Sequence, residues 1–302
     1  MQVLKRVIRT GMPGVLALCS AFTYGADTLS HIKETQTVTI AHREASVPFS
    51  YLVEDKGGVQ RPVGYAVDIC LKLVDAIKKE LKLPQLKVNY LPVTGSTRIP
   101  AIVDGKADLE CGSTTNNAER RKQVAFTIPH FFATARMAVR IDSGIKNWTD
   151  LKEKKVVTTK GTTTVKLLTE RDKVRGLDLK LIEGNDHNAS FGMVENFQAD
   201  AFPMDDVLLY GLRANARDPA KFAVVGDALS TEPYAMMLRR DDPAFKALID
   251  REMAHLMDEG EITRLYDKWF RKPIPPKGAN LNMNMGFLLR DTIRFPSDKV
   301  AD

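Results

Sequence analysis

Apolar and polar positions follow two different periods in the first third of the chain. Residues 38–42 alternate between apolar and polar side chains, which predicts a half-buried strand. Between residues 65 and 82, apolar side chains recur every fourth position and predict one helix with a single apolar face; they are Ile69, Leu73, Ile77 and Leu81. Gly64 precedes this helix, and Pro48 excludes a helix from the loop at 43–51.

The alternation of strand and helix continues beyond this helix. Strands are expected at 86–91 and 107–110, and a short helix between them ends near Val103. From residue 134 on, further strands or extended segments are expected at 134–141, 155–159, 179–182, 199–204, 222–225 and 234–238. The helices expected in this part are at 147–151, 160–171, 190–197, 207–214, 243–260 and 261–270. The tail from Pro273 is expected to wrap over the protein.

This order of elements predicts an α/β fold with two lobes, each a mostly parallel sheet flanked by helices and joined by two crossover segments. Lobe 1 would comprise residues 26–134 and 235–302, and lobe 2 residues 135–234. With 302 residues, 44% of them hydrophobic, the chain is long enough for two cores. A cleft between two lobes is the usual place for a small ligand.

Residues 1–25 have the pattern of a secretory signal peptide. A basic start is followed by an apolar run at 11–22 that is too short to span a bilayer. We expect cleavage after Gly25, with Ala21 as the alternative. Lipid attachment at Cys19 is disfavoured, because a leucine stands before it where lipobox patterns place a small residue.

The charge of the chain changes when this segment is removed, because it holds three basic side chains and no acid. The net charge falls from +6 to +3. The sequence also lacks a stripe of basic residues interleaved with aromatic residues, which is the pattern expected of a nucleic-acid-binding protein. No later apolar run is long enough for a membrane span. We therefore expect a soluble, monomeric protein of the periplasm without a nucleic-acid partner.

Cys70 and Cys111 remain in the exported chain. An oxidising compartment permits a disulfide between them. Two buried free thiols are an equally open alternative, since the sequence supplies no geometry. The chain has no CxxC pair, His/Cys cluster or HExxH spacing, so neither a metal nor another cofactor is expected.

The stretch at 110–126 combines a strand end, a hydroxyl-rich loop and a helix start. Asn116 is expected to cap the helix, and Glu119 to complete a capping box. Cations follow at 120–122, where the helix dipole disfavours positive charge. An anion held by free N–H groups, the hydroxyls at 113–115 and an arginine would reverse that penalty. The alternative is a capped surface helix with solvated charges.

Hydroxyl-rich turns at helix starts recur at 94–97, 113–115 and 158–164. Arginines at comparable strand ends strengthen the case for an anionic ligand; they are Arg43, Arg98 and Arg120. The turn at 158–164 lacks the GxxxxGK[ST] spacing of a nucleotide-binding loop. Asp205 ends an apolar strand, where it suits an ammonium group or, alternatively, caps the next helix.

Four stretches carry a resemblance to a known family: HREASVPFSY at 42–51, ECGSTTNN at 110–117, MDD at 204–206 and KPIPPK at 272–277. From about Val38 to its C-terminus, the chain resembles the solute-binding proteins of amino-acid ABC importers, in the type II periplasmic binding protein class. The glutamate/aspartate-binding branch is the most similar. The resemblance implies a protein that is not an enzyme. It would capture an acidic amino acid by lobe closure and deliver it to an inner-membrane ABC permease.

The same resemblance implies ten ligand-binding residues: Arg43, Ser96, Arg98, Ser113, Thr115, Arg120, Thr159, Thr162, His187 and Asp205. Arg120 would hold the α-carboxylate with help from Ser113 and Thr115. Asp205 would take the α-ammonium. The remaining residues would surround the side-chain carboxylate, with two arginines in lobe 1 and a threonine pair and His187, neutral or charged, in lobe 2. A ligand of net charge −1 suits three arginines and one aspartate.

Two residues depart from the pattern of that branch. Gly95 stands where a serine usually precedes the arginine of the second loop, and Ser96 is expected to substitute for it. Pro203 lies in a strand that should run through lobe 2. Because proline cannot donate a ladder hydrogen bond, this strand is expected to be an edge strand or to bend there.

Other classes of function stay open at this point. An enzyme on the same scaffold, a prephenate- or arogenate-type dehydratase, would need an acid or base in the cleft. The candidates are His42, Glu44, Asp68 and His187, and no pair of them stands out by spacing. A binding protein for a neutral polar amino acid and the sensor domain of a receptor are the further alternatives.

Overall fold

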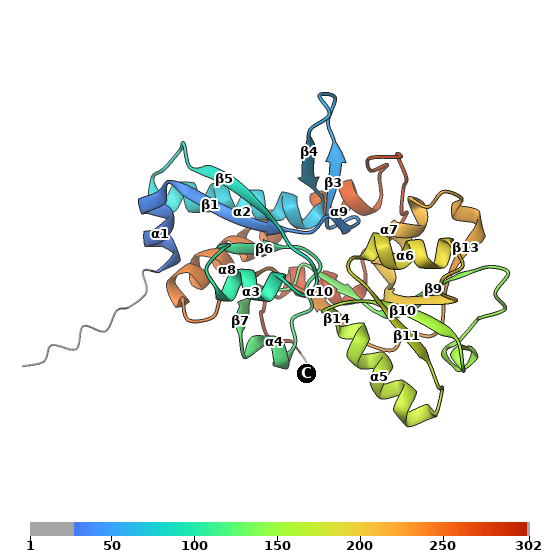
Figure 1. The fold of residues 1–302 in the computed structure, drawn as a ribbon. Helices are drawn as coiled ribbons and strands as arrows, with labels where there is room; N and C mark the ends of the chain where they lie inside the picture. Colours follow the sequence, from blue (N-terminus) through green and yellow to red (C-terminus); the bar gives the residue numbers. More distant parts are fainter. Residues whose placement is uncertain (1–26, 301–302) are drawn as a thin grey trace, which may run out of the picture.

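The computed structural model describes residues 27–300, so the predicted signal peptide lies outside the described residues. Two five-stranded sheets lie on either side of strand β14 (Figure 1). We call the unit around the first sheet lobe 1 and the unit around the second sheet lobe 2. None of the helices between residues 27 and 300 is long and apolar enough to cross a membrane.

The sheet of lobe 1 has the strand order β5-β1-β6-β15-β7, formed by Lys87–Pro92, Thr37–His42, Leu109–Cys111, Met237–Arg239 and Val124–Phe126. β1 runs parallel to β5 and β6, whereas β15 runs antiparallel to β6 and β7. A hairpin sheet of β2 (Ala45–Ser46), β3 (Ser50–Glu54) and β4 (Gln60–Val63) projects from this lobe. Its helices are α1 (Thr28–Thr35), α2 (Tyr65–Leu81), α3 (Arg98–Val103), α4 (Ala118–Arg121), α8 (Pro243–Asp258), α9 (Glu261–Phe270) and α10 (Phe287–Arg294).

The sheet of lobe 2 has the order β11-β10-β12-β9-β13, formed by Lys180–Gly184, Lys155–Thr159, Ala201–Asp205, Ala135–Arg140 and Phe222–Val225. β10 is parallel to β11 and β12, and β9 is antiparallel to β12 and β13. The helices are η1 (Trp148–Leu151), α5 (Thr163–Arg175), α6 (His187–Glu195), α7 (Asp206–Ala214) and η2 (Pro219–Lys221). Both sheets are therefore mixed, because in each the strand next to a crossover runs against the parallel strands.

The two crossover segments lie beside each other between the lobes. β8 (Phe131–Ala133) leaves lobe 1, β14 (Glu232–Tyr234) returns to it, and the two pair antiparallel. Tyr234 also forms a bridge to Thr115 in the loop before α4. The returning crossover, β14, thus passes directly beside the loop that the sequence singles out for anion binding.

Helix α2 shows why the sequence pattern predicts lobe 1 well. Ile69, Leu73 and Ile77 are fully buried, as the four-residue spacing requires. Gly64 begins the helix with φ +138°, and a Cβ there would lie 2.2 Å from the carbonyl oxygen of Phe49. Only glycine fits, so the helix start is fixed against the loop that carries Arg43.

Three local predictions are wrong. α4 is capped by Asn117 and not by Asn116, because the Asn117 side chain accepts from Arg120 N. The Asn116 side chain accepts instead from the Arg121 guanidinium. Since the cap lies one residue later than expected, Glu119 does not have the spacing of a capping box. Helix α6 begins at His187 rather than near 190, because Asp186 caps it. The strand with Pro203 is central, neither an edge strand nor a bend.

Pro203 is tolerated there because β12 pairs mainly with one neighbour. Its register with β9 runs through all five residues, with Pro203 opposite Met137. Its parallel register with β10 is confined to Ala201 and Val156, before the proline is reached. The missing N–H of Pro203 therefore interrupts no pairing with β10.

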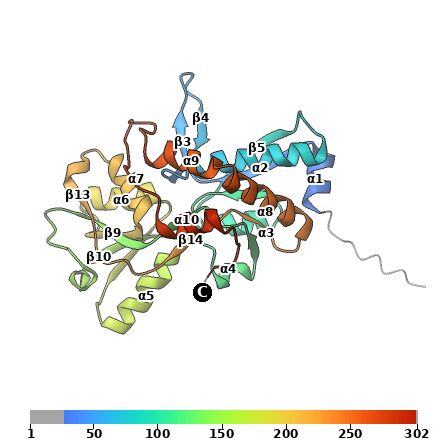
Figure 2. The same ribbon diagram turned by 180° about the vertical axis from the view of Figure 1, so that it is seen from behind.

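The tail wraps over the protein as expected, but it also contains helix α10, which the sequence pattern does not predict. The Tyr51 hydroxyl donates to the Pro275 carbonyl, and Lys277 Nζ donates to the carbonyls of Asn215 and Ala216, just past α7. α10 contacts α8 and β8 and lies across the middle of the molecule (Figure 2). The tail therefore touches both lobes.

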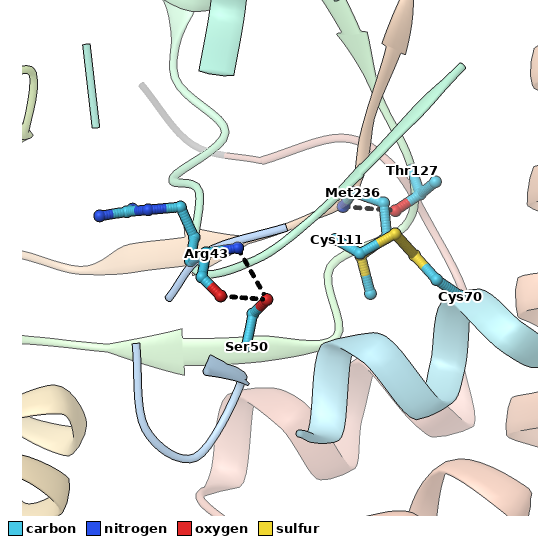
Figure 3. Close-up of a disulfide and its surroundings, with 6 residues drawn as sticks. All are labelled: Arg43, Ser50, Cys70, Cys111, Thr127 and Met236. Carbon is cyan, nitrogen blue, oxygen red and sulfur yellow. Dashed lines mark hydrogen bonds between the residues drawn. A yellow bond between two sulfur atoms is a disulfide. The ribbon is translucent and has the colours of Figure 1, made fainter. Parts of the chain in front are cut away.

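Cys70 and Cys111 form a disulfide, which decides between the two alternatives left open by the sequence. Their Cα atoms are 6.2 Å apart, and the bond joins α2 to the end of β6 (Figure 3). In the same view, Ser50 Oγ accepts from Arg43 N at 2.9 Å and donates to Arg43 O at 3.3 Å. Both covalent and hydrogen-bonded contacts thus hold the strand ends from which the candidate site is built.

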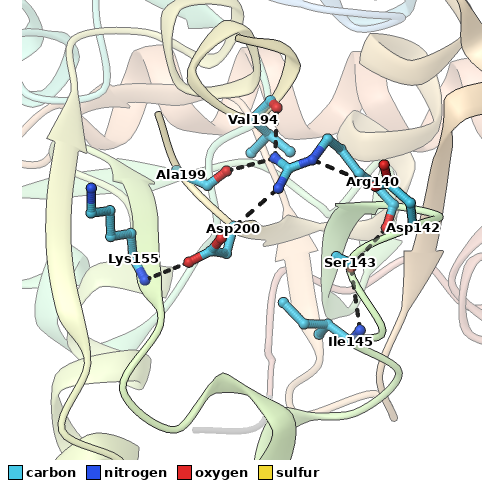
Figure 4. A network of polar contacts seen from close by, with 8 residues as sticks. All are labelled: Arg140, Asp142, Ser143, Ile145, Lys155, Val194, Ala199 and Asp200. Carbon is cyan, nitrogen blue, oxygen red and sulfur yellow. Dashed lines mark hydrogen bonds and ion pairs between the residues drawn. The ribbon is translucent and has the colours of Figure 1, made fainter. Parts of the chain in front are cut away.

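Arg140 has a comparable structural role in lobe 2. Its Nη1 donates at 3.0 Å to the carbonyls of Val194 and Ala199, and its Nη2 lies 3.9 Å from Asp200 Oδ1 (Figure 4). Asp200 Oδ2 in turn accepts from Lys155 N at 2.9 Å. This network ties the end of α6 to β9 and β10, so it fixes the helix whose first residue is His187.

Candidate ligand-binding site

Eight of the ten predicted ligand-binding residues are buried: Arg43, Arg98, Ser113, Thr115, Arg120, Thr159, His187 and Asp205. They come from strand ends and helix starts of both lobes. The other two differ. Ser96 is exposed and its hydroxyl contacts Thr94 Oγ1 at 3.1 Å, while Thr162 is half-buried and donates to Thr159 O at 2.7 Å.

Two arginines of lobe 1 meet one carbonyl of lobe 2. Arg98 Nη2 lies 3.4 Å and Arg120 Nη2 3.3 Å from the oxygen of Gly161. On their other sides, Arg98 Nη1 donates to Thr114 Oγ1 at 2.6 Å, and Arg120 Nη1 donates to Thr115 O at 2.9 Å. The loop at 113–115 therefore orients both guanidinium groups, and the lobes are in direct contact through them.

Arg43 starts a second chain of contacts across the lobes. Its Nη2 lies 3.5 Å from His187 Nε2, and His187 Nδ1 lies 3.0 Å from Thr159 Oγ1, which contacts Ser190 Oγ at 2.9 Å. An arginine only donates, so Nε2 accepts and the ring proton is on Nδ1. Burial, with Arg43 and Arg98 nearby, lowers the pKa of His187 well below its usual value, which makes the ring neutral.

Asp205 occupies the N-cap position of α7, but its side chain does not cap the helix. Asp206, the first residue of α7, accepts with its Oδ1 from Val207 N at 2.8 Å and from Thr134 N at 3.2 Å. Asp205 Oδ2 accepts from the Tyr234 hydroxyl, and its Oδ1 has no partner in the described chain. Burial, followed by nearby Glu232, raises the pKa of Asp205 to about 8. A cationic group beside Oδ1 would restore the ionised form.

Several buried polar atoms of this cluster lack a hydrogen-bond partner within residues 27–300. They are Arg43 Nη1, Arg98 Nε, Ser113 Oγ and Asp205 Oδ1. Unsatisfied buried groups are costly and rare, so each calls for a ligand or another explanation. The arginine and serine groups can donate to carboxylates, and Asp205 Oδ1 can accept from an ammonium.

The lowered pKa values of the buried arginines also favour an anionic ligand. Burial is the main cause that lowers the pKa of Arg43 to about 10 and of Arg120 to about 9, with Arg98 adding repulsion in both cases. Both remain cationic at neutral pH. Three like charges are thus held close together out of water, and a bound carboxylate would relieve their repulsion.

Two glycines, Gly95 of lobe 1 and Gly161 of lobe 2, lie at a close contact between the lobes. A Cβ built at Gly95 would lie 2.4 Å from the carbonyl oxygen of Lys160, and one at Gly161 would lie 2.5 Å from the carbonyl of Gly95. Neither position can hold a side chain without a shift of backbone. Gly95, a departure from the expected pattern, is therefore a contact between the lobes, and Ser96 does not replace a serine side chain in the buried cluster.

Sequence reasoning missed two side chains of the cluster, Glu110 and Tyr234. Glu110 is fully buried in the middle of β6; a charged residue within a short apolar strand was a visible signal. Tyr234 reaches Asp205 from β14, and no local pattern indicates that contact. Of the candidate catalytic groups, Glu44 is exposed and Asp68 accepts from Lys268 and Trp269 Nε1 at 2.6 and 2.7 Å. Neither of these two carboxylates belongs to the buried cluster.

Comparison with known proteins agrees with this geometry. Residues 38–272 match the family of bacterial extracellular solute-binding proteins, family 3. An L-glutamate/L-aspartate-binding protein of Pseudomonas aeruginosa is 47% identical over 275 residues, covering 91% of this chain and 90% of that one. The glutamate/aspartate import solute-binding protein of Escherichia coli K12 is 41% identical over the same shares. Among solved structures, a cysteine-binding protein from Campylobacter jejuni has a TM-score of 0.70 at 26% identity, covering 81% of this chain and 93% of that one.

The two sheets, joined by two crossover segments with the buried charged cluster between them, form the two-lobed type II periplasmic binding protein fold. The chain belongs to family 3 of the bacterial extracellular solute-binding proteins. Three relatives at 41–47% identity are named as binding proteins for glutamate and aspartate rather than as enzymes.

Proposed function

We propose that this protein captures glutamate or aspartate outside the cytoplasm and delivers it to an ABC permease. The observation that carries the proposal is the set of buried, unsatisfied donors on Arg43, Arg98 and Ser113 opposite the unsatisfied acceptor Asp205 Oδ1. An α-amino dicarboxylate supplies the two acceptor groups and the one ammonium donor that these atoms lack. The names of the relatives at 47% and 41% identity support the same ligands.

The ten residues take the roles expected from the sequence, with two adjustments. Arg120 and the loop at 113–115 bind the α-carboxylate, and Asp205 with Tyr234 binds the ammonium. Arg43 and Arg98 bind the side-chain carboxylate. Ser96, being exposed, and Thr162, whose hydroxyl is used by Thr159 O, contribute through backbone position at the close contact of the lobes rather than through their side chains.

Capture works by closure of two bodies, residues 26–134 with 235–302 and residues 135–234. Contacts to Gly161 O and His187 form only when the lobes meet, so a ligand that neutralises the arginines favours the closed state. A monomer with the signal peptide removed would act in the periplasm, where the joint surface of the closed lobes docks on the inner-membrane permease. No cofactor takes part.

Calorimetric titration of the refolded chain tests the proposal. The chain starts at residue 26, and carried-over ligand is removed by unfolding. We expect glutamate or aspartate to bind far more tightly than glutamine, asparagine or arginine. Arg98→Ala should weaken the acidic ligand about a hundredfold or more, as expected for truncation of a buried charge partner. Arg251→Ala is the matched control, because it removes the same charge from an arginine whose side chain is 66% exposed.

Other outcomes would change the proposal. Tight binding of glutamine or asparagine in preference to the acids would keep the importer but reassign the ligand. Absence of binding to any amino acid would contradict it.

A further inference from the structure

A chain of buried hydrogen bonds runs from the backbone of lobe 2 to Arg43 of lobe 1. It starts at the carbonyl of Asp186, to which the Ser190 hydroxyl donates at 2.9 Å. Thr159 Oγ1 comes next, 2.9 Å from Ser190 Oγ and 3.0 Å from His187 Nδ1. The chain ends where His187 Nε2 lies 3.5 Å from Arg43 Nη2. Ser190 and Thr159 are fully buried, so the protein itself must satisfy both hydroxyls.

The serine end of this chain decides which atom donates at each step. A hydroxyl has one proton, and a carbonyl oxygen only accepts. Ser190 Oγ is within reach of two carbonyl oxygens, that of Asp186 at 2.9 Å and that of Thr158 at 3.3 Å. The Ser190 proton is therefore used on the backbone, and the Ser190 oxygen accepts from Thr159. Because Thr159 Oγ1 gives its own proton to Ser190, it accepts from His187 Nδ1.

The arginine end of the chain requires the same direction. A guanidinium only donates, so the ring nitrogen that faces Arg43 must be without a proton. The opposite direction would place a protonated Nε2 of His187 against Arg43. It would also leave two oxygens, Ser190 Oγ and Asp186 O, 2.9 Å apart with no proton between them. Both ends thus place the proton of the neutral His187 ring on Nδ1.

Gly184, the last residue of β11, makes room for the serine hydroxyl. A Cβ built at Gly184 would lie 2.3 Å from Ser190 Oγ and 3.1 Å from the Ser190 amide nitrogen. Any other residue at this position would displace the hydroxyl from Thr159. The strand end and the helix α6 are therefore fitted to each other around the Ser190 hydroxyl.

The chain leaves Arg43 with one nitrogen engaged and one free. Nη2 faces His187, whereas Nη1 is buried and has no hydrogen-bond partner within residues 27–300. Ser190, Thr159 and His187 all belong to lobe 2, so the ring proton is placed before the lobes close. When they close, Nε2 is ready to accept from the arginine of lobe 1 without a change of tautomer.

We propose that Ser190 is a positioning residue that keeps the proton of His187 on Nδ1, so that Nε2 holds Arg43 and Nη1 remains for the side-chain carboxylate of the ligand. The inference rests on the proposed function and deepens it, because Ser190 is not among the ten expected ligand-binding residues. It acts through Thr159 and His187 rather than on the ligand.

The test locates the ring proton by nitrogen NMR of the ligand-free chain with isotope-labelled histidine, at neutral pH. The two tautomers give different nitrogen signals, and the His187→Gln variant identifies the signals of His187 by their loss. We expect the proton on Nδ1 in the wild type. In Ser190→Ala, the Thr159 hydroxyl loses its acceptor and donates to Nδ1, so the tautomer with the proton on Nε2 should appear.

Calorimetry of the same proteins measures the effect on the ligand. Ser190→Ala should weaken glutamate binding about threefold to tenfold, as expected for the loss of one hydrogen bond between His187 and Arg43. Ser143→Ala is the control, because its hydroxyl bonds to Arg140 O and Ile145 N in the loop after β9. It should change neither the tautomer nor the affinity.

Three results would overturn the role of Ser190. A proton on Nε2 in the wild type would reverse the direction of the chain, and this measurement requires no variant to fold. A proton that stays on Nδ1 in Ser190→Ala would show that the hydroxyl does not place it; a purely structural defect would give this result together with weaker binding. Unchanged affinity in Ser190→Ala despite a changed tautomer would show that the tautomer does not matter for the ligand.

The wild-type titration keeps the two proposals apart. Binding of glutamate by the wild type supports the proposed function whatever the tautomer of His187 is. If the wild type binds no amino acid, the proposed function fails, and the role of Ser190 in ligand binding fails with it. If glutamate binds and any of the three results above is found, only the role of Ser190 is refuted.

Discussion

The backbones of Gly95 in lobe 1 and Gly161 in lobe 2 are in direct contact. A Cβ on Gly161 would lie 2.5 Å from the carbonyl carbon and oxygen of Gly95 and 2.6 Å from the amide nitrogen of Ser96. Gly161 also has φ +74°, which disfavours any other residue. The same residue presents the carbonyl that Arg98 and Arg120 share, so close approach and arginine binding occur at one point.

Gly95→Ala should therefore weaken ligand binding by about tenfold or more, because a methyl group at this contact costs overpacking energy only in the closed state. Affinity is measured by calorimetry, and closure by the decrease in radius of gyration when ligand is added in X-ray scattering. The stability of the ligand-free protein should change little. Gly192→Ala in α6, where a Cβ would meet nothing within 4 Å, is the control. Unchanged affinity in Gly95→Ala would refute the closure contact.

Binding of an amino acid should release a proton from Asp205. Burial raises its pKa to about 8, so much of this carboxyl is protonated at neutral pH without ligand. A bound ammonium lowers the pKa, and the proton leaves. Affinity should accordingly rise as the pH increases toward about 8 and level off above it, because a ligand that expels a proton binds better where protons are scarce.

Calorimetry in two buffers with different ionisation enthalpies measures this release directly. At about pH 7 the apparent binding enthalpy should depend on the buffer, and the slope gives the number of protons released. Asp205→Asn should abolish the dependence as well as weaken binding. A wild-type enthalpy that is the same in both buffers would rule out the linkage.

His130 should make the protein sensitive to acid. It is buried among the rings of Phe49, Tyr65 and Tyr234, and burial lowers its pKa to about 3. In the unfolded chain, histidine binds a proton below about pH 6.5. The unfolded state then holds more protons, so stability is complete above that pH and is lost as the pH falls toward about 3. Each pH unit in this window costs up to about 1.4 kcal/mol per such group.

Denaturant unfolding between neutral and acidic pH checks this expectation. His130→Phe should flatten the pH dependence, because an aromatic ring that does not ionise replaces the imidazole. His255→Gln, at an exposed position of α8, should leave the dependence unchanged. An identical slope in His130→Phe and the wild type would show that His130 is not the responsible group.

The disulfide between Cys70 and Cys111 should stabilise the protein by about 2–4 kcal/mol, since it closes a loop of the unfolded chain. The two cysteines are 41 residues apart in sequence. Urea unfolding of the refolded chain with and without a reducing agent measures the difference. The Cys70→Ala/Cys111→Ala variant should be destabilised similarly and should not respond to the reducing agent. A wild type equally stable in both conditions would contradict a stabilising bond.

Local patterns predict the regular elements because their physical cause is local. The fourfold spacing in α2 and the apolar run of β10 each follow from which face is buried, and both elements begin and end within one or two residues of the expected positions. The positions of the three arginines in lobe 1 and of Asp205 in lobe 2 at strand ends or helix starts are also predictable, because the ends of parallel strands within each lobe converge at one edge of its sheet. The direction of β15 and β9, which makes both sheets mixed, depends on where the crossovers return the chain and has no local signal.

Contacts between distant segments account for what the sequence does not reveal. Tyr234 bonds to Asp205 across 29 positions, and the role of Gly95 depends on Lys160 and Gly161 in the other lobe. α10 is placed by its contacts with α8 and β8 rather than by a strong pattern of its own. Where a tertiary contact decides the conformation, residue spacing alone is insufficient.

Two serines near the arginines should behave differently although both are expected ligand-binding residues. Ser113 is buried and its hydroxyl has no partner within the described residues, whereas Ser96 is exposed and its hydroxyl contacts Thr94. A hydrogen bond to a charged carboxylate contributes about 1.5–3 kcal/mol, so Ser113→Ala should weaken glutamate binding by about tenfold to a hundredfold. Ser96→Ala should change it less than about twofold, because its hydroxyl is already hydrated. Titration of both variants with glutamate tests this difference. A large loss of affinity in Ser96→Ala would show that the Ser96 hydroxyl contributes to ligand binding, and the prediction would be wrong.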